Sequence, residues 1–79
     1  MLPEKHEILV NRYYRHFKGG LYRVIGIATH SETEEKLVIY QAQYGEHEWF
    51  ARPYKMFTEP IDNKKYPDAK QKYRFELIK

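Results

Sequence analysis

The sequence predicts an all-β domain, a small barrel of five mostly antiparallel strands. Short runs rich in β-branched and aromatic residues alternate with polar segments that contain Gly or Pro, a pattern typical of strands joined by turns. The chain of 79 residues contains 8 Tyr, 4 Phe and 1 Trp but no Cys. We therefore expect one domain, residues 1–79, with an aromatic and aliphatic core that no disulfide supports.

The N-terminal part predicts one helix and the first two strands. Residues 2–13 are expected to form a short helical extension, because Pro3 suits a first helical turn. Strands are expected near 14–17 and 21–30, with a Lys-Gly-Gly turn between them. Gly26 lies inside the second strand and indicates a bend or bulge.

The rest of the chain predicts two hairpins and a closing strand. Ser31 and Glu34 have the spacing of a helix capping box, but the β-branched and aromatic residues that follow favour a hairpin with a polar loop over 31–36. The later elements are strands 37–44, 48–52 and 73–78, a one-turn 3-10 helix over 54–57, and a polar loop over 58–72. Five strands with this spacing fit an SH3-like barrel. The expected core is Val24, Ile27, Val38, Tyr40, Phe50, Met56, Phe57 and Phe75.

The net charge of +3 is unevenly distributed along the chain. Residues 1–26 hold five Lys/Arg against two Glu, residues 27–59 three against six Glu, and residues 60–79 six against three Asp/Glu. A nucleic-acid interface needs clustered cations, so the two basic ends would have to meet in space. Arg15 and Lys18 are the candidate phosphate contacts in the first basic end.

Nothing in the sequence predicts a membrane protein. The longest uncharged run is the nine residues 37–45, which is too short to span a bilayer. The N-terminus has no long apolar stretch and does not resemble a signal peptide. We expect a cytoplasmic protein without a membrane partner.

Three stretches together resemble a known family. They are YRHFKG at 14–19, ATHSET at 28–33 and WFARPYKMF at 49–57. In this order they resemble the bacterial family called domain of unknown function 1653 (DUF1653), over about residues 13–58 and 73–78. The resemblance implies an SH3-type barrel and no established activity; residues 60–72 depart from it by being more basic.

Catalytic and metal-binding signals are weak. His6, His16, His30 and His47 are widely separated and form no i, i+3 or i+4 pair on a predicted helix. The best available set is His16, His30 and Glu32, which leaves a metal-dependent or small-molecule enzyme as a minor alternative. There is no Cys and no G-x-S-x-G motif. We therefore predict no catalytic residue, no metal and no cofactor.

A binding surface is the favoured functional prediction. The chain has more large aromatics than so small a core can cover with their polar ends satisfied, namely Tyr14, Tyr22, Tyr44, Trp49 and Tyr54. The predicted binding residues are Tyr22, His30, Glu32, Tyr44, Trp49 and Arg52, and the expected partner is a protein or peptide. A nucleic acid stacked on the aromatics is the alternative.

The same residues also allow a purely structural interpretation. We expect His30, Glu32 and Arg52 to meet in one polar corner beside Trp49, where Arg52 could bind a carboxylate or phosphate. In the structural interpretation Arg52 pairs with Glu32, Trp49 packs under a loop, and His30-Ser31-Glu32 only turns the chain.

Overall fold

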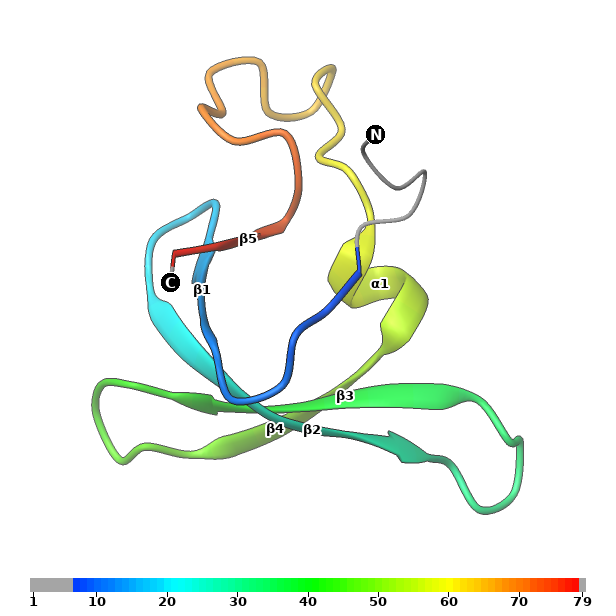
Figure 1. Cartoon of the computed structure of the whole chain (residues 1–79). Coiled ribbons are helices and arrows are strands. Elements are labelled where there is room, and N and C mark those ends of the chain that lie inside the picture. Colours follow the sequence, from blue (N-terminus) through cyan, green and yellow to red (C-terminus); the bar gives the residue numbers. More distant parts are fainter. Residues whose placement is uncertain (1–6, 79) are drawn as a thin grey trace.

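The computed structural model describes residues 7–78 and contains five strands and one short helix (Figure 1). In chain order these are β1 (Tyr13–His16), β2 (Leu21–Thr29), β3 (Lys36–Ala42), β4 (Trp49–Pro53), α1 (Tyr54–Thr58) and β5 (Phe75–Leu77). All neighbouring strands are antiparallel and form one sheet in the order β4-β3-β2-β1-β5. The prediction of a mostly β domain with five antiparallel strands is confirmed, with strand ends shifted by at most two residues.

The sheet is strongly bent but open, which corrects the expectation of a closed barrel. Within residues 7–78, no ladder joins β4 to β5, so these two strands remain the edges of the sheet. β2 is shared by both parts of the bend, because its start pairs with β1 and nearly its whole length pairs with β3. The register shifts between Val24 and Gly26, which confirms the bulge expected at Gly26.

The predicted N-terminal helix is wrong where the structure describes it. Residues 2–6 lie outside the described residues, and residues 7–12 form irregular chain and a turn. The backbone N–H groups of Ile8 and Leu9 donate to the hydroxyls of Tyr54 (3.1 Å) and Tyr14 (2.8 Å). Asn11 then has a φ of 69°, a conformation that interrupts a right-handed helix. Tertiary hydrogen bonds therefore replace the local helical ones.

The helix before the last strand is also different in kind. α1 is one turn of α-helix, where the sequence predicted a 3-10 helix over 54–57. The Thr58 hydroxyl donates to the carbonyl of Tyr54 at 2.9 Å, an i to i−4 contact that suits the wider turn. Among residues 7–78, no helix has the length and apolar character needed to cross a bilayer.

An aromatic cluster between the two parts of the sheet forms the core. Five expected core residues are buried: Val24, Val38, Tyr40, Phe57 and Phe75. The rings of Phe57 in α1 and Phe75 in β5 stack with centroids 4.0 Å apart, and Tyr14 meets Phe57 edge-on at 5.9 Å. The sequence did not identify four further buried residues, which are Ile8, Tyr14, Ala42 and Ile61.

Three predicted core residues are wrong, each for a positional reason. Ile27 is 39% exposed because it lies beyond Arg23, where the pairing of β2 with β1 ends, so no strand covers that side of it. Phe50 is 38% exposed because it lies on β4, which has no strand on its other side. Met56 is 44% exposed because the inward position of the short helix α1 belongs to Phe57.

The adjacent pair Phe57 and Met56 allows a controlled test of the core. Phe57→Ala should lower the free energy of unfolding by about 3–5 kcal/mol, because it empties the space that a fully buried ring occupies against Phe75. A domain of this size has little more stability in total, so the variant should be largely unfolded by circular dichroism at room temperature. Met56→Ala, one residue away, should cost about 1 kcal/mol or less. Equal melting curves for Phe57→Ala and wild type would contradict the assignment.

Candidate functional site

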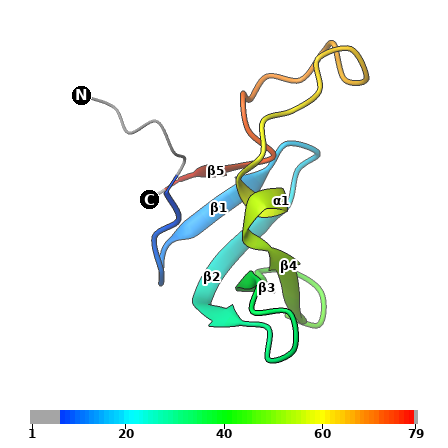
Figure 2. The same ribbon diagram turned by 90° about the vertical axis from the view of Figure 1, so that its right-hand side faces the viewer.

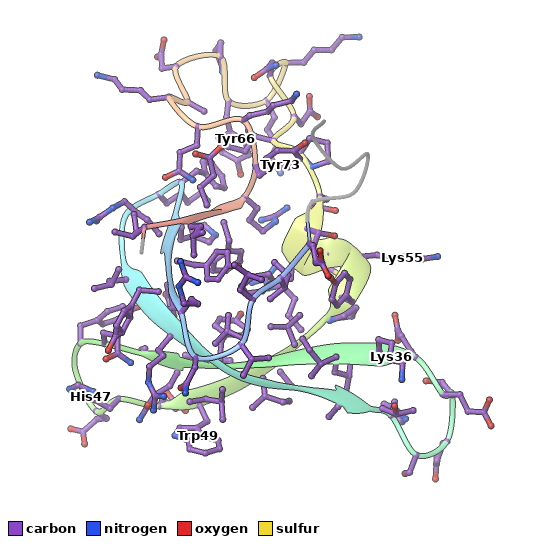
Figure 3. All side chains as sticks on the ribbon, in the orientation of Figure 1. Lys36, His47, Trp49, Lys55, Tyr66 and Tyr73 are labelled. Atoms are coloured by element: carbon purple, nitrogen blue, oxygen red, sulfur yellow. The ribbon has the colours of Figure 1, made fainter. Side chains whose placement is uncertain are left out.

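The structure divides the predicted binding residues among three places. Tyr22, Tyr44 and Arg52 gather at the concave inner face of β2–β3–β4, where Arg52 pairs with Val38 in the β3–β4 register. Trp49 pairs with Gln41 on the opposite, outer face and points away from the core (Figure 3). His30 and Glu32 lie in the turn at the tip of the β2–β3 hairpin.

The His30 turn does not form the expected polar corner with Arg52. The Nδ1 atom of His30 accepts the backbone N–H of Glu32 at 3.1 Å and lies 3.4 Å from that of Thr33. The backbone of His30 is also bonded to Glu35 and Glu34, both at 2.8 Å. Within residues 7–78, no ion pair or hydrogen bond joins Glu32 to Arg52. The side chain of His30 therefore supports the turn locally.

Aromatic side chains line the inner face beside β4. The ring of Tyr22 lies edge-on to those of Tyr44, Phe50 and Tyr40, with centroids 5.5, 6.4 and 5.4 Å away. The hydroxyls of Tyr22 and Tyr44 are hydrogen-bonded to each other. Burial and this bond to Tyr44 raise the pKa of Tyr22 to about 12, so it keeps its proton at neutral pH.

Gly20 permits the close packing of these two tyrosines. Its φ of +93° is a conformation that side chains rarely adopt, and a Cβ there would lie 3.2 Å from the Tyr22 ring and 3.4 Å from that of Tyr44. Because Gly20 has no side chain, the β1–β2 turn can pack directly against the rings of Tyr22 and Tyr44.

Arg52 is held over the core with part of its guanidinium uncommitted. Its Nε atom donates to the Tyr40 hydroxyl at 3.1 Å, and its Cζ lies 5.7 Å from the centroid of the Phe75 ring. In the described part of the chain, its Nη atoms have no hydrogen-bonding partner. The arrangement can present two donors to a carboxylate, a phosphate or a carbonyl group.

β4 offers unpaired backbone groups as well as side chains. Two bonds show which backbone groups of β3 point to β4 and which point to β2. The N–H of Ala42 donates to the carbonyl of Glu48 at 3.0 Å, and the N–H of Gln43 donates to that of Leu21 at 2.9 Å. By the alternation of an antiparallel ladder, Phe50 bonds to β3, whereas the main-chain groups of Trp49 and Ala51 point outward. Figure 2 shows β4 on the outer side of β3. Trp49 is 59% exposed.

We call the exposed rings of Tyr44, Trp49 and Phe50, the half-buried Arg52 and the outward backbone of β4 the β4 surface. The sequence identified its side chains except Phe50, which it placed in the core. The alternation of residue types along β4 indicated that Phe50 faces the inner side of the sheet. Phe50 is nevertheless exposed because β4 is an edge strand.

A second region lies at the opposite end, between the β1–β2 turn and the loop after α1. Phe17 and Tyr66 meet edge-on with centroids 4.8 Å apart, and the ammonium groups of Lys18 and Lys65 lie 5.1 and 5.6 Å from the Tyr66 ring. Lys18 hydrogen-bonds the exposed Tyr66 hydroxyl and lowers its pKa. The two basic ends of the sequence therefore do approach each other here.

Acidic residues are mixed with these cations. Hollows of about 390 and 310 Å³ adjoin Phe17 and Tyr66, and their walls include Glu59 and Asp62 in one and Asp68 in the other. Glu59 is paired with Arg74. Of the two candidate phosphate contacts, Lys18 is engaged with Tyr66, and Arg15 is exposed with its carbonyl accepting from Gln71 at 3.2 Å. The region is not a uniformly basic face.

His16 lies next to this second region and is kept neutral. Its ring stacks on Phe17 and meets Phe75 edge-on, both with centroids 4.8 Å apart, and its Nδ1 atom accepts the N–H of Lys18 at 3.1 Å. Burial, and then the charges of Arg74, Arg52 and Lys18, lower the pKa of His16 to about 4. His16 ends β1 and His30 lies in the β2–β3 turn, so the two form no shared ligand set. Among residues 7–78, no group of three or more His, Asp or Glu side chains is placed to hold a metal ion.

Comparison with protein families gives a match that covers most of the chain. The family model described as "protein of unknown function (DUF1653)" matches residues 12–77. The chain belongs to the DUF1653 family. No curated protein and no solved structure gives a significant match. The matched span includes the loop between α1 and β5, so the Phe17–Tyr66 contact lies within the DUF1653 domain.

Neutral His16 should make the folding of this DUF1653 domain depend on pH. Because the His16 pKa is about 4 in the fold against an ordinary 6.5, the unfolded chain binds more protons between these values. The contribution of His16 to stability is therefore complete above about pH 6.5 and is lost as the pH falls towards 4. His16→Asn, which keeps an acceptor for the Lys18 N–H but does not titrate, should show a smaller loss than wild type over this window in chemical denaturation. A His16 imidazole that titrates near 6.5 by NMR would contradict this.

Proposed function

We propose that this DUF1653 domain is a non-catalytic binding module that recognises a protein through the β4 surface. We also infer that its bent sheet is of the SH3-like type, which the helical turn between β4 and β5 supports. The observation that carries the functional proposal is the coincidence, on one edge strand, of exposed aromatic side chains, an uncommitted guanidinium and outward backbone groups.

These features are the ones that a protein partner uses. Tryptophan, tyrosine and arginine supply much of the binding energy in protein interfaces, since each buries a large area and offers a hydrogen bond. An edge strand with outward N–H and C=O groups can accept a further strand from a partner. β4 contains no Lys, Asp or Glu that would discourage such pairing.

The nucleic-acid alternative has less support. Lys18 and Lys65 converge on Tyr66, which would suit a stacked base with a nearby phosphate. However, Glu59, Asp62 and Asp68 share the hollows beside that ring, and a polyanion would meet them at the same time. The balance of charge therefore favours the β4 surface as the binding site.

The proposal predicts that two single substitutions weaken binding of a partner recovered from lysate. Trp49→Ala and Arg52→Ala, each shown to be folded by circular dichroism, should each cost roughly 1–3 kcal/mol of binding free energy if these residues are interface anchors. The measurement is a pull-down with nuclease-treated and untreated lysate, followed by titration of the recovered protein.

A matched control is Val10→Ala. Val10 is 48% exposed but lies in the turn before β1, away from β4, so this variant should bind as wild type does. If both β4 variants retain wild-type binding, the β4 surface is not the site. Loss of the recovered partner after nuclease treatment would instead support the nucleic-acid alternative.

A further inference from the structure

We infer that the partner of the β4 surface is a second copy of this chain, paired antiparallel along β4 with a two-fold axis at Phe50. The inference rests on the proposed function, because it names the partner of the same surface. It follows from the register of β4 and from the order of side chains around Phe50.

The backbone groups of β4 can complete each other in this arrangement. Trp49 and Ala51 point their N–H and C=O groups outward, one residue on each side of Phe50. Antiparallel pairing centred on Phe50 places Trp49 opposite Ala51 of the second copy, so each outward N–H meets an outward C=O. Pro53 has no N–H and ends the ladder, which keeps the contact short.

The charges on the inner face are complementary in the same register. Glu48 and Arg52 lie two residues on either side of Phe50, so Glu48 of one copy faces Arg52 of the other, and the symmetry repeats this pair. Glu48 is exposed, and in the described part of the chain its carboxylate has no ionic partner. The Nη atoms of Arg52 are also uncommitted. Opposite charges placed directly across a strand pair stabilise it, and like charges destabilise it.

The apolar side chains fit the same pairing. On the inner face, the two Phe50 residues meet at the axis in a non-hydrogen-bonded pair, whose Cα atoms lie about 4.5 Å apart. On the outer face, the large ring of Trp49 lies opposite the small side chain of Ala51 of the second copy. The strand is therefore self-complementary in backbone, charge and size, and a two-fold contact of this kind closes on itself without forming fibres.

The interface is small, so the dimer should be weak and concentration-dependent. Sedimentation equilibrium of the purified chain between about 10 μM and 1 mM should show reversible dimerisation. Glu48→Arg and Arg52→Glu each place like charges across the strand pair twice. Each variant alone should therefore dimerise at least roughly ten-fold more weakly than wild type. When the two variants are mixed, opposite charges face each other again, and a heterodimer should form with near wild-type affinity.

The matched control is Glu32→Arg, the same charge change in the β2–β3 turn, which should leave dimerisation unchanged. If Arg52→Glu fails to fold because Arg52 also bonds Tyr40, Ala51→Pro replaces it. That variant removes one outward N–H and spares the ladder to β3, so it should be folded and monomeric.

A wild-type chain that stays monomeric up to about 1 mM would overturn the inference. So would a dimer that Glu48→Arg and Ala51→Pro leave intact. These results differ from failure of the proposed function. If the chain is monomeric but Trp49→Ala weakens a recovered partner, the function stands and only the self-pairing is lost. If the chain is monomeric and Trp49→Ala has no effect on that partner, both fall.

Discussion

The stacked contact between Phe57 and Phe75 joins parts of the chain that the sheet by itself leaves apart. Phe57 is carried by the helical turn that follows one edge strand, and Phe75 belongs to the other edge strand. No ladder connects β4 to β5 within the described residues, so the stacked rings close the domain together with an isolated antiparallel bridge between Pro60 and Tyr73. Tyr40 meets both rings edge-on and Tyr14 meets Phe57 edge-on, which extends the contact to the strands between them.

This mode of closure determines where the molecule can interact. Because no strand of the described chain pairs with the outer side of β4, it keeps its outward backbone groups, and Phe50 is only partly covered. Arg52 is tied to the same core through Tyr40 and Phe75, so its guanidinium has a defined position at the margin of the aromatic cluster. The interaction surface is therefore a direct product of how a chain without disulfides builds its core.

The sequence was informative wherever the signal is local. Runs of β-branched and aromatic residues located all five strands, Gly26 located the bulge, and the residue types of β3 identified Val38 and Tyr40 as buried. Where tertiary contacts determine the local structure, the prediction from sequence was wrong. The Ile8 N–H bonds to the hydroxyl of Tyr54, which lies 46 residues further along the chain, and no local pattern reveals this contact.

The candidate site was likewise predicted where the signal is local and missed where it depends on tertiary structure. Aromatic composition pointed to Tyr44 and Trp49, but the expected corner of His30, Glu32 and Arg52 depended on register. Arg52 pairs with Val38, whereas His30 and Glu32 lie in the turn beyond the last pair of the ladder, Thr29 with Lys36. The contact between Phe17 and Tyr66 joins segments far apart in sequence, so it could only be found once the chain was folded.

The position of Trp49 has a consequence for how this protein can be observed. It is the single tryptophan of the chain, and its indole lies largely in water on the outer face of the sheet. Unfolding changes the surroundings of such a ring only slightly, so intrinsic fluorescence is a poor monitor of the folded state. A partner that binds β4 excludes water from the same indole, so the fluorescence emission of Trp49 reports association.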